Sequence, residues 1–155
     1  MLFEIKLLKN SDEINRLYNF IKQFPLDYPD YGLWLKKCKR ELEIGYKKAY
    51  TAIDIDNNKI LGSIIFQPHK KEKSILEIKN LRVDPNFTGK DIGSILQTMV
   101  EFYASQHNFK RIQGDVHSNN PTLEFLISQG LKVEAEETLY SKTTEVILYK
   151  DLNKD

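Results

Sequence analysis

Apolar and polar residues alternate in several short stretches of the chain, which is the pattern of half-buried strands. Residues 2–8 and 49–55 each predict a strand by this criterion, and the densely apolar residues 60–67, after turn residues at 56–59, predict the next strand of the same meander. Between the first and second of these strands, apolar residues recur at helical spacing and predict two helices. Asn10 is the expected N-cap of the first helix, and Gly45 is the expected end of the second.

The second half of the chain alternates between the two periods. It predicts strands at 74–83 and 110–117 around a helix at 91–107, whose expected buried face consists of Ile92, Ile95, Leu96, Met99 and Tyr103. A helix from Pro121 to Gly130 and an antiparallel pair at 131–136 and 144–152 follow. The predicted fold is therefore one α/β (α+β) domain over residues 1–155, in the order β-α-α-β-β-β-α-β-α-β-β. Its central sheet is mixed and mostly antiparallel, with helices on both faces and a parallel pair across the 91–107 helix.

The predicted strand at 74–83 contains a conflict of register. Leu76 and Ile78 share one parity, whereas Leu81 and Val83 share the other, so a regular strand cannot bury both pairs on one face. A β-bulge near residues 79–80 resolves the conflict by inserting one residue, and it would leave backbone groups free for a ligand. The alternative is a strand that is buried on both faces.

Composition excludes several classes of protein. The 155 residues carry 23 basic and 22 acidic side chains, so a formal charge of +1 provides no general field for nucleic acid. The single cysteine, Cys38, cannot form an internal disulfide and shares an apolar helical face, which predicts a buried thiol in a cytoplasmic protein. No segment is apolar for the roughly 20 residues that a membrane helix needs. His69, His107 and His117 lack the spacing of metal ligands, so we expect no metal.

The segment from Leu81 to Leu96 carries the clearest chemical signal. A strand ends, a loop with Gly89 follows, and an amphipathic helix begins next to Gly93. The first N–H groups of a helix have no intrahelical acceptor, and the helix dipole is positive at that end, so a phosphate can bind there without a large positive charge. The spacing matches neither a Walker A loop nor a G-x-G-x-x-G dinucleotide loop.

Two blocks of the sequence resemble the GNAT superfamily of N-acetyltransferases. Residues 88–93, Thr-Gly-Lys-Asp-Ile-Gly, are similar to the family pattern [Q/R]-x-x-G-x-[G/A], preceded by Leu-Arg-Val-Asp-Pro. Residues 119–131, from Asn119 to Leu131, are similar to a second family block, N-x-x-A-x-x-[LF]-Y-x-x-x-G-F. The specific motifs cover about residues 75–131, and the order of elements is similar over nearly the whole chain.

This resemblance implies that acetyl-CoA is the co-substrate. Its pantetheine arm would pair like an added strand with the backbone at Leu81, Arg82 and Val83, and Asn119 would bond near the pantetheine end. The other role open to Asn119 is that of a helix N-cap before Pro121, and the two roles are compatible. The pyrophosphate would lie on backbone N–H groups of Thr88, Gly89, Lys90, Asp91, Ile92, Gly93 and Ser94. Thr88 and Asp91 depart from the family pattern by replacing a long polar side chain and a glycine, and Asp91 is expected either to repel the pyrophosphate or to cap the helix.

The catalytic residues are less fully specified by the resemblance. Glu77 lies eleven residues before Thr88, the spacing of the catalytic glutamate in the histone-acetylating branch, and is the first candidate for the general base. The alternative is an ion pair with a lysine across the sheet. Asp115 and His117, at the end of the 110–117 strand, are second candidates or ordinary polar strand-end residues. Leu126 stands where many relatives carry the tyrosine that protonates the thiolate, so the general acid is unassigned. Tyr28, Tyr31 and Trp34 are expected either near the acceptor or in the core.

The resulting functional prediction is transfer of an acetyl group from acetyl-CoA to a primary amine, by direct attack in a ternary complex. The alternative is a CoA-binding or protein-interaction module whose catalytic centre has decayed. The acceptor, a small molecule or a protein, is not specified by the sequence, and a homodimer is left open.

Overall fold

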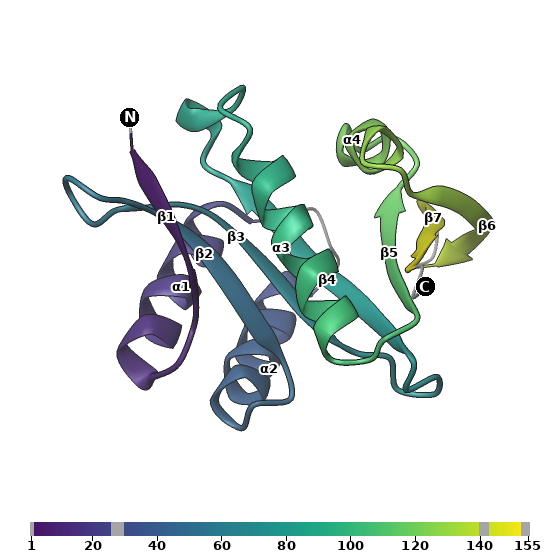
Figure 1. Cartoon of the computed structure of the whole chain (residues 1–155), viewed down its shortest axis with the longest axis horizontal. Helices are drawn as coiled ribbons and strands as arrows, with labels where there is room; N and C mark the ends of the chain where they lie inside the picture. Colours follow the sequence, from purple (N-terminus) through teal and green to yellow (C-terminus); the bar gives the residue numbers. More distant parts are fainter. Residues whose placement is uncertain (1, 26–29, 140–142, 153–155) are drawn as a thin grey trace. The chain divides into compact units, whose positions relative to one another are not determined.

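The computed structural model describes residues 2–25, 30–139 and 143–152. Within them, the elements follow the predicted order, with one short 3-10 helix, η1, inserted after the fourth strand (Figure 1). The strands are β1 Phe3–Leu7, β2 Lys48–Asp54, β3 Ile60–Pro68, β4 Ile75–Val83, β5 Arg111–His117, β6 Lys132–Leu139 and β7 Thr143–Asp151. The helices are α1 Ser11–Gln23, α2 Tyr31–Glu43, η1 Pro85–Phe87, α3 Ile92–Gln106 and α4 Thr122–Ser128.

The sheet is mixed, as predicted. Hydrogen-bonded neighbours follow the order β1-β2-β3-β4-β5-β7-β6. β4 and β5 run parallel, as a crossover through α3 requires, whereas the pairs β1–β2, β2–β3, β5–β7 and β6–β7 run antiparallel. The chain forms two compact units, the first from residues 1–67 and 80–100 and the second from residues 68–79 and 101–155, so that β4 and α3 each contribute to both.

The two N-terminal helices of the first unit begin and end where the sequence predicts. The N–H of Glu13 donates to the Asn10 side chain at 3.0 Å, and the N–H of Lys9 donates to the Glu13 carboxylate at 2.9 Å, a variant of the capping box. The second helix ends at Gly45, whose φ of 83° is the left-handed conformation that glycine adopts without a Cβ penalty. Both predicted helix boundaries are confirmed.

The β2–β3 hairpin is buried on both of its faces. Apolar residues of α1 and α2 pack on one face, where they meet Ala49, Ile53 and Ile65. On the other face, a side chain at Gly62 would meet Ile92 and Leu96 of α3. Helices therefore cover both faces of this part of the sheet, which explains why the hairpin is apolar or small at almost every position rather than alternating.

The predicted buried face of α3 is partly wrong. Ile92 and Leu96 are buried as expected, but the stripe continues through Val100 and Ala104 rather than through Met99 and Tyr103. Ile95 is 37% exposed, and the polar residue Gln97 is fully buried instead. Ile92, Leu96, Val100 and Ala104 are spaced four residues apart, so their side chains lie on one face of the helix and point into the core. The positions of apolar residues in the sequence do not by themselves identify this face.

The β4 strand buries alternate residues as far as Asn80. Leu76, Ile78 and Asn80 are buried, whereas Leu81 and Val83 are half-buried. The position that follows Ile78 on the buried side is therefore a polar asparagine, and the predicted bulge stays a prediction. The parallel ladder with β5 runs from Ile75 only to Ile78, opposite Gly114.

The second unit closes with the expected helix and antiparallel pair. α4 starts directly after Pro121 and is followed by Gly130 with a φ of 94°, as the sequence predicts. β6 and β7 pair from Lys132 and Tyr149 onwards, with a register shift between Val133 and Ala135. In the part of the chain that the structure describes, no helix is long and apolar enough to cross a membrane.

The close approach of α3 to β3 predicts a sharp contrast between two glycines. A Cβ at Gly62 would lie 3.0 Å from Ile92 Cγ2 and 3.2 Å from the Arg82 carbonyl oxygen, so Gly62→Ala should lower the free energy of unfolding by about 1–3 kcal/mol, the usual cost of overpacking. Gly32, inside α2, has open space around the same position. Gly32→Ala should therefore raise stability by roughly 0.5–1 kcal/mol. Urea denaturation of both variants measures the difference, and equal effects would contradict the packing.

Candidate functional site

The turn between β4 and α3, in the first unit, is held in place by Asp84. This residue is buried, and its backbone N–H donates to the Leu61 carbonyl oxygen at 2.8 Å. Its carboxylate accepts the N–H of Asn86 at 2.9 Å, and the Lys59 ammonium lies 3.6 Å from its second oxygen. The start of the turn is therefore anchored to β3, and a charged residue here has a structural role.

The turn that follows, residues 88–91, is exposed and has an unusual backbone. Gly89 has a φ of 79° and Asp91 a φ of 62°, so two of these four residues occupy the left-handed region. A Cβ at Gly89 would meet no protein atom within 4 Å. Its backbone conformation, rather than the space around it, requires glycine.

The first turn of α3 presents backbone rather than side chains. The N–H of Ile95 donates to the Asp91 carbonyl oxygen at 3.0 Å, which makes Asp91 the residue that precedes the helix. The Ile92 side chain is buried, so this residue offers its backbone alone to a ligand, and Gly93 next to it has no side chain. N–H groups of the first turn have no intrahelical acceptor and lie at the positive end of the helix dipole. The turn can therefore hold an anion, with the exposed Asp91 carboxylate as an opposing charge.

The end of β4 shows an alternation of backbone direction. The Arg82 carbonyl oxygen lies next to Gly62, and the Asp84 N–H bonds Leu61, so both point toward β3. Backbone groups of successive strand residues point to opposite edges, so those of Leu81 and Val83 point away from β3. The Arg82 side chain donates from Nε to the Phe24 carbonyl oxygen at 3.0 Å, which ties it to the end of α1.

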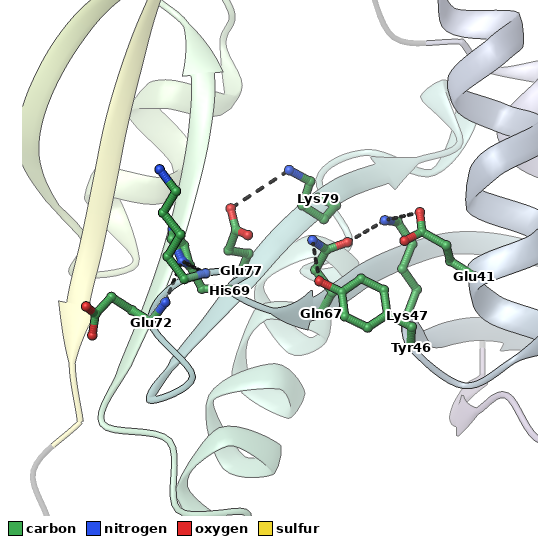
Figure 2. Close-up of polar contacts among 9 residues, drawn as sticks. Glu41, Tyr46, Lys47, Gln67, His69, Glu72, Glu77 and Lys79 are labelled. Carbon is green, nitrogen blue, oxygen red and sulfur yellow. Dashed lines mark hydrogen bonds and ion pairs between the residues drawn. The ribbon is translucent and has the colours of Figure 1, made fainter.

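The three candidate bases lie on one face of the second unit. Glu77 of β4 stands opposite Gln113 of β5, and Asp115 and His117 follow at alternate positions of β5, so all of them share that face. The Glu77 carboxylate is directed toward the Lys79 ammonium at 3.9 Å, and both side chains are half-buried (Figure 2). Glu77 therefore has a lysine partner, but this lysine lies on the same strand and not across the sheet, where the ion-pair alternative places it.

One acidic residue of this face is missed by sequence reasoning. Glu145 of β7 stands directly opposite His117, and its side chain is only 1% exposed. Its Oε1 lies 3.3 Å from His117 Nε2, and among the described residues neither atom has a hydrogen-bond partner. Burial raises the pKa of Glu145, the nearby Asp115 raises that pKa further, and His117 lowers it. The sequence contains no signal for this cluster, because it depends on the register between β5 and β7.

The block that begins at Asn119 has a different capping residue from the expected one. The side chain of Asn120, not that of Asn119, accepts the N–H of Thr122 at 2.9 Å at the start of α4. Asn119 is exposed, and the capping role that the sequence offers it is taken by its neighbour Asn120. Leu126 is buried in the packing of α4, in agreement with its inability to act as an acid.

The remaining candidates of the first unit have structural contacts. Tyr31 donates to the Ile21 carbonyl oxygen at 3.1 Å and stacks on Trp34 with ring centroids 5.6 Å apart, while Tyr28 lies outside the described residues. Cys38 is buried, as predicted, and burial raises the pKa of its thiol to about 12, which excludes a thiolate nucleophile at neutral pH.

A buried ion pair lies near that thiol. Lys47 contacts the carboxylate of Glu41 at 3.1 Å and also the side-chain oxygen of Gln67, whose amide faces the Tyr46 hydroxyl (Figure 2). The positive charge of Lys47 opposes the rise in the pKa of Cys38 without cancelling it. Every polar end of this group has a partner inside the unit, so the arrangement serves the fold.

Comparison with known proteins gives a consistent family assignment. Residues 14–130 match the model of the acetyltransferase (GNAT) family. No curated protein sequence matches the chain at a significant level. Among solved structures, the ribosomal-protein-S18-alanine N-acetyltransferase of Escherichia coli is similar with a TM-score of 0.80 at 15% identity, covering 99% of this chain and 96% of that one.

Two further structures extend the likeness. NAA60 of Arabidopsis thaliana, solved with acetyl-CoA, has a TM-score of 0.78 at 14% identity and covers 99% of this chain and all of its own, 100%. A protein of the GNAT family from Desulfovibrio desulfuricans has a TM-score of 0.84 at 11% identity and covers 97% of this chain and 99% of that one. At these identities the likeness concerns the fold.

Gly89 and Asp91, the two residues of the turn with a left-handed backbone, should respond to substitution in opposite ways. Gly89→Ala places a Cβ at a φ of 79° and should lower the free energy of unfolding by about 1–2 kcal/mol, although nothing crowds the site. Asp91→Gly relieves the same kind of strain at a φ of 62° and should leave stability unchanged or raise it by up to about 1 kcal/mol. Chemical denaturation tests both, and a destabilised Asp91→Gly would show that the carboxylate stabilises the helix start.

Proposed function

Because the chain belongs to the GNAT family of acetyltransferases, we propose that it transfers an acetyl group from acetyl-CoA to a primary amine, by direct attack in a ternary complex. The observation that carries this proposal is the exposed turn before α3, with Gly89 and Asp91 in left-handed conformations at a helix N-terminus. That arrangement suits a pyrophosphate, because backbone donors and the helix dipole attract it without bulky side chains.

The described residues fit acetyl-CoA in two places of the first unit. Backbone N–H groups between Thr88 and Ser94 would hold the pyrophosphate, with Lys90 offsetting part of the Asp91 charge. The backbone edge at Leu81 and Val83, which points away from β3, would pair with the amide groups of the pantetheine arm as an added strand would. In the second unit, the exposed Asn119 is the candidate for a bond near the pantetheine end.

The reaction needs a neutral amine and a group that accepts protons. An ammonium acceptor first loses one proton, its nitrogen then attacks the thioester carbonyl, the new N–C bond forms, and the C–S bond breaks. The second proton leaves the nitrogen, and the departing thiolate takes one proton to become a thiol. Glu77, Asp115 and His117 lie on one face and can accept the first proton, with Glu77 favoured by its spacing.

An α-amino group is the acceptor that we test first. Structural neighbours include an N-acetyltransferase of ribosomal protein S18 alanine and a NatC complex bound to a peptide and CoA, whereas nourseothricin acetyltransferase covers less of the chain. An α-amine titrates near pH 7.7–8.0, in contrast to about 10.4 for a lysine side chain, so more of it is neutral at physiological pH. The panel comprises peptide N-termini, a lysine peptide and a small polyamine. Cytoplasmic location and pairing as a homodimer stay predictions.

The second candidate function is a CoA-binding module without turnover. Two observations favour it: Leu126 is buried where many relatives are expected to carry an acid, and the exposed Asp91 carboxylate opposes the charge of a pyrophosphate. Both candidates bind the cofactor, so only release of CoA thiol in the presence of an acceptor separates them.

Acetyl-CoA should raise the melting temperature of the protein, since a ligand that binds only the native state stabilises it by RT ln(1 + [L]/Kd). Asp91→Gly should bind acetyl-CoA more tightly than the wild type, most clearly at low salt, because a like charge at about 4 Å costs about 1 kcal/mol in water and more near a protein surface. Differential scanning fluorimetry and calorimetry at two salt concentrations measure both effects. Absence of any binding at millimolar acetyl-CoA would refute the proposed function.

Three isosteric variants identify the group that accepts the amine proton. Removal of the general base should lower turnover by about 10²–10⁴-fold while CoA affinity and folding are retained. Glu77→Gln, Asp115→Asn and His117→Gln are compared with a lysine peptide and with an α-amine peptide, by thiol release. The loss should be larger for the lysine peptide, because less of that amine is already neutral. Full activity of Glu77→Gln beside a defect in a β5 variant would exclude Glu77 and place the base on β5.

A further inference from the structure

The hydrogen-bonding capacity of the buried Glu145 carboxylate is not fully satisfied by the described residues. Its side chain is only 1% exposed, and its Oε1 has no hydrogen-bond partner among the described residues. A charged group without hydrogen bonds is costly to bury, and a residue of the same size without charge would fill the space at lower cost. Among the described residues, Nε2 of His117 is the polar atom in contact with Oε1, at 3.3 Å. This nitrogen also has no hydrogen-bond partner among them.

The charges that face Glu145 come from both neighbouring strands. Asp115 and His117 lie on the same face of β5, and Glu137 of β6 is its direct register partner. Asp115 and burial raise the pKa of the Glu145 carboxyl, whereas His117 lowers it. Since three members of this group are acids, His117 is the member that can supply a positive charge, so Glu145 and His117 are electrostatically coupled.

We propose that Glu145 is a positioning residue for His117: its buried carboxylate accepts a hydrogen bond from Nε2–H of the imidazole, which leaves Nδ1 as the ring nitrogen that takes a proton from the amine acceptor. This inference rests on the proposed acetyl transfer, and it takes His117 of β5 as the proton acceptor in place of Glu77, which only its spacing from Thr88 favours. A small rotation of either side chain turns the 3.3 Å contact into a hydrogen bond that satisfies both orphaned atoms at once.

The proposed step moves one proton and leaves the charges balanced. The acceptor ammonium gives its proton to Nδ1 and becomes a neutral amine, and the imidazole becomes an imidazolium. Glu145 holds the ring in one orientation and one tautomer during this step, and its negative charge stabilises the imidazolium that forms. The pair determines the tautomer of His117, because a neutral imidazole has one N–H and a hydrogen bond from Nε2 to Glu145 keeps that proton on Nε2.

The tautomer can be observed directly in the wild-type protein. Imidazole ¹⁵N spectra report which ring nitrogen carries the proton, and the chain has only His69, His107 and His117 to assign. His117 should be protonated at Nε2 when neutral. In Glu145→Gln, the pH midpoint of the His117 signals should fall, whereas those of His69 and His107 should stay in place. Protonation of neutral His117 at Nδ1, or a His117 titration unaffected by Glu145→Gln, would overturn the proposal.

Stability against pH separates a positioning role from a structural one. A carboxyl whose pKa is raised in the folded state favours folding below its unfolded pKa, and this contribution is lost as the pH rises through the folded pKa. Glu145→Gln should therefore unfold at higher denaturant than the wild type at pH 7.5, and this advantage should shrink toward pH 4. Glu137→Gln, at the exposed register partner, is the matched control and should show no such pH-dependent gain. Loss of stability in Glu145→Gln at both pH values would indicate a structural carboxylate and overturn the proposal.

Turnover completes the test with the acceptor that is most active in the panel. Glu145→Gln should lower kcat by about 10²-fold, the lower end of general-base catalysis, with the KM for acetyl-CoA unchanged. The acidic limb of its pH profile should move to lower pH, because the imidazolium loses its stabilising anion. Glu137→Gln should match the wild type. A wild type that binds acetyl-CoA and turns over no amine would refute the proposed transfer and leave the spectroscopic result on the pair standing, whereas an active Glu145→Gln with an unmoved profile would refute the positioning role alone.

Discussion

The parallel ladder between β4 and β5 is short, and the functional parts of both strands depend on where it ends. It joins Ile75 to Arg111 and stops at Ile78 and Gly114. Beyond this point β4 directs the backbone of Arg82 and Asp84 toward β3, so the groups of Leu81 and Val83 face the other edge. β5 continues to pair with β7 as far as His117 and Glu145. The residues proposed to bind the pantetheine arm, Leu81 and Val83, and the candidates Asp115 and His117 therefore lie beyond the ladder, whereas Glu77 lies within it.

The start of α3 combines attraction and repulsion for an anion in one turn. Backbone N–H groups and the helix dipole attract a phosphate, while Asp91 places a carboxylate next to them. The left-handed backbone at Asp91 suits aspartate better than most other residues, since Asn and Asp tolerate this region. A glycine would satisfy the same backbone without charge, so the backbone conformation alone does not explain why an aspartate stands at this position.

The polar face of the second unit contains buried ionisable groups, which stabilise a folded sheet less than apolar residues of the same size would. Glu77 is half-buried beside Lys79, whose positive charge partly neutralises it, whereas Glu145 is fully buried near Asp115 and His117. Buried ionisable groups with few partners are typical of sites where proton affinity matters more than folding free energy. The unequal surroundings of the two glutamates are the reason for assigning them different roles.

Local sequence determined the elements of this protein, and only the tertiary structure decided which faces they bury and which polar groups meet. Asn10, Gly45, Pro121 and Gly130 mark helix ends through their own backbone and side-chain chemistry, which requires no distant partner. The exposed Ile95 differs because the face that α3 buries depends on its approach to Gly62 on β3, a contact that helical period alone does not specify. The pairing of His117 with Glu145 lies further still from local information, since a shift of one residue between β5 and β7 would place the two side chains on opposite faces.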